Sequence, residues 1–195
     1  GLPFPNSEQI LHLNSRNTAE GNTQEVSYPD FLDWRAQARS FSSLAAYQQI
    51  AMNISDSGHP PERASGVRVS TNAFSIIGEA PIRGRDFKEG EDAKGTEPVA
   101  IIGYGLWKTR YGSDPNVIGK SIWINDVPTT VIGIMAEGMK FPTNTDVWMP
   151  LVPERNDTDE NLRATVEFVR SLGLRRIGFH PFEVFGRAKY DALGR

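Results

Sequence analysis

Residues 27–47 place the strongest constraint on the fold of this 195-residue chain. Apolar side chains recur there at spacings of three and four, which puts them on one stripe of an α-helix: Phe31, Trp34, Ala38 and Phe41. Ser27, followed three residues later by Asp30, predicts a capping box at the start of this helix. Three large aromatic side chains on one stripe need a broad apolar surface to bury them, most simply a sheet. The segment therefore predicts a helix, ending near Ser40, that packs on a β-sheet.

Strand patterns lie on both sides of this helix. A short apolar run at residues 9–13 predicts a first strand, and residues 44–54 alternate closely enough to predict a second. Residues 55–61 contain the glycine and prolines of a turn, and residues 62–69 then predict the return arm of a hairpin. A helix together with these strands predicts half of an α+β sandwich.

The clearest β pattern lies in the middle of the chain. Residues 120–124 alternate, Asn125 and Asp126 form a turn pair, and residues 127–135 return as a second strand. Pro128 predicts that this return strand is an edge strand or begins after the proline. The other predicted elements are helices at residues 70–77, with Ser70 or Thr71 as cap, 104–111 and 159–172, and strands at residues 98–102, 146–151 and 182–186.

The composition excludes several classes of protein. A net charge of -3 without a long basic run argues against nucleic acid as a partner, because phosphate neutralisation needs clustered lysine and arginine. The chain has no cysteine, which excludes disulfides, thiol chemistry and a cysteine-based zinc site. No apolar run approaches the about 20 residues needed to cross a bilayer, so we expect a soluble chain. Cysteine usage fits the cytosol and a bacterial envelope compartment equally well.

Candidate catalytic and metal-binding residues do not converge in the sequence. His12, His59 and His180 lie in unlike contexts, with no neighbour at metal-ligand spacing. Asp30 and Asp33 would share a helix as a carboxylate pair, but negative charge at a helix N-terminus explains them better than acid–base chemistry does. We therefore assign no catalytic, cofactor-binding or metal-binding residue, and we expect no cofactor.

Two glycine-containing segments match phosphate-binding loops only in part. Residues 103–105 lie between an apolar strand and a helix, but the third glycine of a dinucleotide-binding turn is missing. Residues 119–121 lack the upstream glycine of a phosphate loop and lead into a strand. Neither segment predicts a nucleotide site. The four tryptophans would suit a ligand groove, yet aromatic residues at such spacings more often build a core.

About a dozen short phrases occur in one order along residues 1–153. The most extensive are Tyr28-Pro29-Asp30-Phe31-Leu32-Asp33-Trp34-Arg35, Phe74-Ser75-Ile76-Ile77-Gly78, Gly84-Arg85-Asp86-Phe87, Thr130-Val131-Ile132-Gly133-Ile134-Met135 and Trp148-Met149-Pro150-Leu151. Together they resemble the MacB-like periplasmic core domain of ABC transporter permeases, in particular the branch of orphan permeases that are not fused to an ATPase. Residues 157–175 depart from the family pattern.

The resemblance implies a fold of class α+β. A porter-like α/β sandwich lobe would consist of residues 1–70 with 178–195, and a mainly β lobe of residues 71–177 would be inserted between them. The chain ends at Arg195, just after its last predicted strand. We therefore expect the second half of the porter-like lobe to be truncated, which would leave an exposed sheet edge.

The implied function is non-catalytic. The domain would couple conformational change to export or to a periplasmic partner, on the periplasmic face of the bacterial inner membrane. The implied partners are the rest of the permease with its transmembrane helices, a separate cytoplasmic ATPase, and a periplasmic adaptor or substrate protein. On the residues alone two alternatives stay open: a small secreted or periplasmic hydrolase, and a free-standing ligand-binding module.

Overall fold

The computed structural model describes residues 10–13, 15–16, 23–24, 26–139, 141–152 and 183–188. Its helices are α1 (Tyr28–Gln37), α2 (Ala73–Ile77) and α3 (Tyr104–Tyr111), with a 3-10 turn at Pro115–Val117. The described strands are β1 (Ile10–Leu13), β2 (Ser15–Arg16), β3 (Thr23–Gln24), β4 (Phe41–Asp56), β5 (His59–Val69), β6 (Arg83–Gly84), β7 (Val99–Ile102), β8 (Ser121–Ile124), β9 (Val127–Ile134), β10 (Val147–Pro150) and β11 (Glu183–Ala188). All except the β2–β3 pair belong to one sheet, in the order β1-β11-β4-β5-β10-β7-β9-β6, with β8 beside both β4 and β9.

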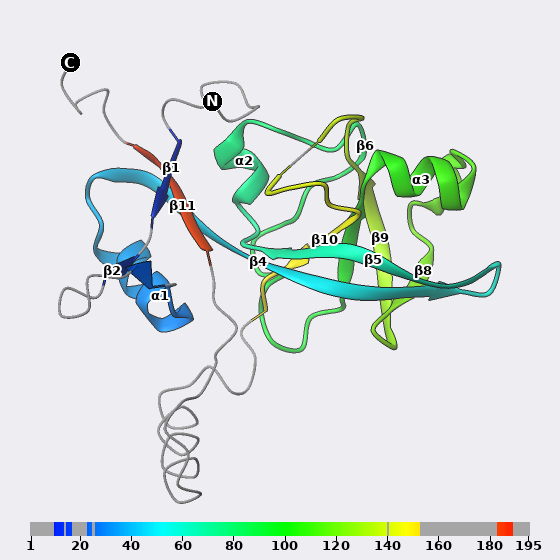
Figure 1. Cartoon of the computed structure of the whole chain (residues 1–195), viewed down its shortest axis with the longest axis horizontal. Coiled ribbons are helices and arrows are strands. Elements are labelled where there is room, and N and C mark those ends of the chain that lie inside the picture. Colours follow the sequence, from blue (N-terminus) through cyan, green and yellow to red (C-terminus); the bar gives the residue numbers. More distant parts are fainter. Residues whose placement is uncertain are drawn as a thin grey trace, which may run out of the picture.

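Strand β4 is 16 residues long and joins the two ends of the molecule (Figure 1). Its first half pairs with β11, and from Tyr47 onward it pairs with β5. The predicted hairpin is thus confirmed, with longer arms than the sequence indicated. Most of residues 55–61 belong to the strands, because the chain reverses tightly at Ser57 and Gly58, where the Gly58 N–H donates to the Asp56 carboxylate.

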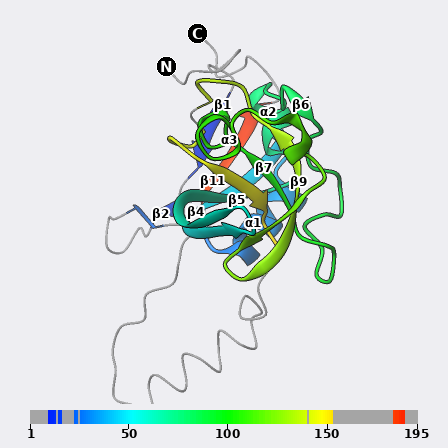
Figure 2. The ribbon, with the colours of Figure 1, turned by 90° about the vertical axis from the view of Figure 1, so that its right-hand side faces the viewer.

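Six strands close into a barrel, since each pairs with the next in the order β4–β5–β10–β7–β9–β8 and β8 pairs back to β4. Alternate side chains of all six strands point inward and form one core: Met52, Ile54, Ala64, Ala100, Ile102, Ile122, Ile124, Val131, Ile134 and Val147. A Cβ at Gly66 would overlap the Met52 side chain, so Met52 lies directly over that backbone. Helix α3 adds Leu106 and Trp107 to this core at one end, which Figure 2 turns toward the viewer.

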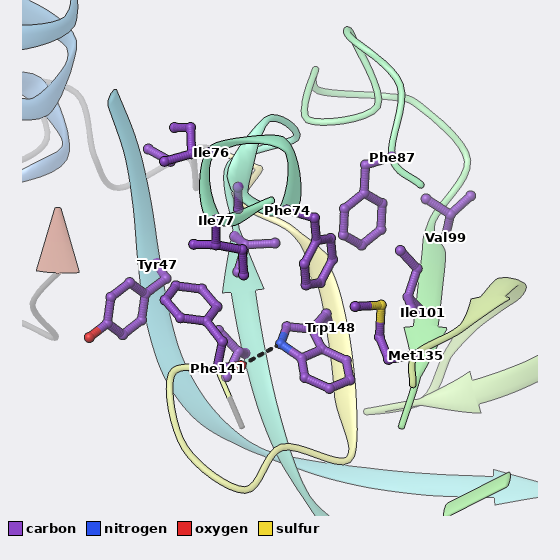
Figure 3. Close-up of a cluster of buried hydrophobic side chains, with 14 of the residues drawn as sticks. Tyr47, Phe74, Ile76, Ile77, Phe87, Val99, Ile101, Met135, Phe141 and Trp148 are labelled. Carbon is purple, nitrogen blue, oxygen red and sulfur yellow. Dashed lines mark hydrogen bonds between the residues drawn. The ribbon is translucent and has the colours of Figure 1, made fainter. Parts of the chain in front are cut away.

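A second core lies on the outer wall of the barrel, under α2 and the loops that follow β6 and β9 (Figure 3). Trp148 of β10 is fully buried there, its ring centroid is 5.8 Å from that of Phe74, and its indole N–H donates to the Phe141 carbonyl over 2.8 Å. Phe87 stacks on the other side of Phe74 at 6.0 Å. The loop after β6 is therefore fixed by an aromatic side chain, although it has little regular structure.

Helix α1 covers the first half of β4. The Ser27 hydroxyl accepts from the Asp30 N–H at 3.2 Å and donates to the Asp30 carboxylate at 2.6 Å, which confirms the predicted cap. The predicted stripe does face one apolar cluster: Phe31 is buried in it, and Trp34, Ala38 and Phe41 are partly buried against it. The helix, however, ends at Gln37 rather than near Ser40, because Phe41 belongs to β4 and pairs with β11.

The remaining predicted elements match closely, with one correction. Gly78 and Gly112 end α2 and α3 with φ of 75° and 57°, the left-handed geometry that glycine adopts without strain. The cap prediction for α2 is wrong, because the Ser70 hydroxyl accepts from the Ala46 N–H instead. The N-cap residue is Asn72, whose side chain makes no capping bond and donates to Ser43 and the Leu44 carbonyl. The helix predicted at residues 159–172 lies outside the described residues.

The β8–β9 hairpin confirms the clearest sequence pattern. Asn125 and Asp126 have φ of 48° and 64°, as a tight turn requires. Pro128 does lie within β9, but β7 pairs with β9 only from Thr130 onward. At the proline β9 has β8 as its sole neighbour among the described strands. The predicted edge position therefore holds only there, because β9 begins at Val127, before the proline, and pairs with both β7 and β8 further along.

Candidate functional site

The carboxylate pair considered from the sequence does not form a site. The Asp30 carboxylate accepts from the Ser27 hydroxyl at the start of α1, and Asp33 is exposed on the same helix. The geometry of Asp30 is that of a helix-capping residue, as the sequence analysis favoured.

The histidines are not brought together. His12 is exposed on β1, with its ring 6.5 Å from that of Tyr47, whereas His59 lies at the tip of the β4–β5 hairpin. His180 lies outside the described residues. Within the part of the chain that the structure describes, no three His, Asp or Glu residues form a group that would hold a metal ion.

The two glycine-containing segments have structural roles. A Cβ at Gly103 would approach the Thr145 carbonyl to 2.9 Å, and the Gly103 N–H donates to the Asp146 carbonyl over 2.7 Å. Gly103 is therefore required for close packing of two chain segments. Gly119 has φ of 86° and its N–H donates to the Val131 carbonyl at the start of β8.

A cluster of ionisable residues joins α3 to the tip of the β4–β5 hairpin. The Arg110 guanidinium, whose side chain is 4% exposed, contacts the carboxylates of Asp56 at 3.0 Å and Glu62 at 3.1 Å. Tyr111 donates its hydroxyl to Asp56 over 3.2 Å, and His59 Nδ1 lies 2.8 Å from the same carboxylate. No local sequence pattern indicates this cluster, because about fifty residues separate α3 from the hairpin tip.

The electrostatics of this cluster suit a structural clamp. Burial alone would raise the pKa of Asp56, but hydrogen bonds from His59, the Gly58 N–H and Arg110 outweigh it and lower that pKa to about 2. Burial, together with the Asp56 charge, raises the pKa of Tyr111 to about 12. Acid–base catalysis works best with groups that titrate near the working pH. These two groups keep one protonation state across the neutral range and hold α3 in place.

A cavity of about 320 Å³ opens at the end of the barrel opposite α3. Its walls come mainly from barrel strands, with Ile50, Met52, Val99, Ile124, Val127 and Met149 among the lining residues. The loop between β6 and β7 contributes Glu91, Ala93, Gly95 and Thr96. We call this cavity the barrel mouth; no sequence pattern indicated it, because several separate strands form it.

Of the four tryptophans, two build cores. Trp107 and Trp148 are buried, and the Trp107 indole N–H donates to the Asp114 carbonyl over 2.8 Å. Trp123 is 48% exposed on the outer side of β8. None of the four lines the barrel mouth. In the described part of the chain no helix is long and apolar enough to cross a membrane.

Solved structures share this fold. The chain matches a domain of a putative permease from Porphyromonas gingivalis with a TM-score of 0.64 at 14% identity, over 97% of this chain and 79% of that one. It matches the periplasmic region of MacB from Actinobacillus actinomycetemcomitans with a TM-score of 0.63 at 12% identity, over 96% and 79%. The extracellular domain of the noncanonic ABC-type transporter YknZ from Gram-positive bacteria gives 0.58 at 14% identity, over 93% and 83%. The fold is that of extracytoplasmic domains of ABC transporters.

The family is defined by the sequence as well. The model of the MacB-like periplasmic core domain matches residues 2–179, and the chain therefore belongs to this family. It is a periplasmic domain of an ABC transporter permease-like protein, and its family is one of transporter domains rather than of enzymes. A comparison with curated proteins gives no match.

Proposed function

We propose that this chain is a non-catalytic coupling domain of a permease subunit. It transmits conformational change, driven by a separate cytoplasmic ATPase, to an exported substrate or to a periplasmic partner at the bacterial inner membrane. In this proposal residues 1–70 with 178–195 form a porter-like lobe and residues 71–177 form an inserted β lobe, whose barrel also includes β4 and β5 of the first lobe. The match of residues 2–179 to the family is the observation that carries the proposal.

The arrangement of β4 supports coupling. Strand β4 pairs with β11 beside α1. Further along, the same strand pairs with β5 and with β8 and so belongs to the barrel. A displacement at the α1 end is therefore passed to the barrel through continuous backbone hydrogen bonds. No flexible linker separates the two regions along this strand.

A hydrolase is less well supported. It would need converging titratable groups near their working pH, together with a cleft. The ionisable cluster at the hairpin tip instead holds Asp56 at a pKa of about 2 and Tyr111 at a pKa of about 12. Assay of the chain against ester, peptide and glycoside substrates tests this alternative, and an activity that Asp56→Asn or Tyr111→Phe abolishes would support the hydrolase.

The gene on either side of this segment gives the first test of the permease assignment. Four or more flanking apolar stretches of about 20 residues are expected, since each would span a bilayer as a helix. Their absence would overturn the assignment and favour a free-standing module.

Coupling itself is tested by distance measurements in the intact permease with its ATPase, reconstituted in nanodiscs. Spin labels are placed at Ala36→Cys on α1 and at Lys108→Cys on α3, two exposed positions in a chain without cysteine. Distances to gadolinium-labelled lipids are expected to change when ATP is trapped, and to stay constant with a hydrolysis-deficient ATPase. Equal distances in both nucleotide states at both labels would contradict coupling.

A further inference from the structure

The barrel mouth has the size and position of a ligand site. Its volume of about 320 Å³ lies at the lower end of the range for small-molecule sites, and barrel mouths are among the places where ligands bind. The opposite end of the barrel is closed by Leu106 and Trp107 of α3. A molecule that enters from the open end therefore meets the apolar barrel interior and has no exit through it.

The walls of the barrel mouth favour apolar ligands. Ile50 and Met149 are only partly buried, although they pack against the barrel core, so their side chains present apolar surface to the opening. Val127 at the rim is 44% exposed. Met52 and Met149 add flexible side chains, which adapt to irregular shapes. Burial of this surface by a ligand would contribute about 25 cal/mol for each Å² removed from water.

Both charged residues that line the barrel mouth, Arg68 and Glu91, are already engaged by other groups of the protein. The Glu91 carboxylate is held by Arg85 at 2.6 and 3.1 Å and by the Lys88 N–H at 2.8 Å. The uncharged polar residues Thr96 and Asn125 complete the rim. An ionised ligand would lose its hydration on entering this apolar site, and the site offers no unpaired charge of opposite sign to compensate for that loss.

We propose that the barrel mouth binds an uncharged small molecule with an apolar body and a single polar end, such as a hydroxyl. The apolar body lies against Ile50, Val127 and Met149, and the polar end stays at the rim near Asn125. This inference goes beyond the proposed function, because it depends on the barrel alone and not on transport.

The test titrates the methyl-labelled chain with three probes that share one alkyl body: 1-octanol, octanoate and octyltrimethylammonium. Saturable shifts of the Ile50, Ile124 and Met149 methyl signals are expected with 1-octanol, while the exposed Ile82 serves as an internal reference for non-specific contact. The Kd for 1-octanol is expected to be at least about tenfold lower than for either ion, because the site offers no unpaired charge to replace an ion's hydration. The proposal is overturned if an ion binds as tightly as octanol, or if no probe gives saturable shifts at these methyls.

Two matched variants locate the site. Val127→Glu puts a charge at the rim and is expected to weaken 1-octanol binding at least about tenfold, because the alkyl body would then lie against an ionised group. Trp123→Glu changes a similarly exposed apolar residue of the same hairpin that does not line the cavity, and binding is expected to stay unchanged. Equal loss in both variants would overturn the location. If a variant fails to fold, the methyl shifts of the unmodified chain still show whether 1-octanol binds at the barrel mouth.

Discussion

The barrel and the α1 end share strand β4 but differ in how their edges are closed. Every barrel strand has a neighbour on both sides, whereas β1 at the α1 end has β11 alone among the described strands. The barrel core contains thirteen buried apolar residues of the described chain, while the cluster under α1 contains five: Val26, Phe31, Leu44, Ala46 and Leu151. Regions with fewer buried contacts open at lower free energy. One continuous sheet therefore supports two regions of unequal stability.

The largest expected effect comes from the barrel side. Trp148→Ala removes a fully buried ring and is expected to lower the free energy of unfolding by about 3 to 5 kcal/mol. Trp123→Ala, at a 48% exposed site, is the matched control and is expected to cost under about 1 kcal/mol by the usual behaviour of surface substitutions. Denaturant unfolding of both variants measures the difference. Similar losses of unfolding free energy in the two variants would contradict the view that the buried Trp148 ring stabilises the barrel wall.

Phe31→Ala tests the α1 end. It removes the fully buried ring beneath the helix, with an expected cost of about 3 kcal/mol, confined to this region. Hydrogen exchange should show loss of protection in α1 while β7 and β9 keep theirs. Leu32→Ala, at a 37% exposed site on the same helix, is the control. Loss of protection spread evenly over both regions would mean that they unfold as a single unit.

Arg110→Met tests the clamp between α3 and the hairpin tip. Removal of one partner from a buried ion pair costs about 3 to 5 kcal/mol, and we expect about 2 to 3 here because the Glu62 side chain is 53% exposed. Lys108→Met on the exposed side of α3 is the control. Addition of Asp56→Asn to Arg110→Met should recover part of the loss, because it removes the unpaired carboxylate. A double variant less stable than Arg110→Met would contradict this account.

The smallest effect concerns pH. The pKa of Asp56 falls from its ordinary value of 3.8 to about 2 in the folded chain. Its stabilisation is therefore complete above about pH 5 and is lost as the pH falls through about 2. The pKa falls by just under two units, and at roughly 1.4 kcal/mol for each unit the contribution is at most about 2 to 3 kcal/mol. The stability gap between the wild type and Asp56→Asn should narrow between about pH 5 and about pH 2, and a constant gap would contradict the assigned pKa.

Local sequence signals predicted local structure well. The helices α2 and α3 end where Gly78 and Gly112 adopt positive φ, a preference that belongs to single residues. The Asn125–Asp126 turn was predictable for the same reason. The helical spacing wrongly placed Phe41 on the helix, because spacing along the chain does not show that strand β11 pairs with this residue.

The candidate sites depend on long-range pairing. Closure of the barrel joins Ile54 of β4 to Ile124 of β8, seventy residues apart, and the clamp joins Asp56 to Arg110. No pattern within a short window encodes either contact. The resemblance to the family anticipated the class of protein, but the barrel mouth and the clamp emerge only when the strands are assembled.

The length of β4 has a mechanical consequence. At about 3.3 Å per residue its 16 residues span roughly 50 Å, from beside α1 to the far tip of the hairpin. A pull directed along this strand loads its lateral hydrogen bonds to β5 and β11 in shear, so that many must yield together rather than one after another. In the proposed coupling role, β4 would bear tension along its axis, and the barrel would follow when the α1 end is pulled.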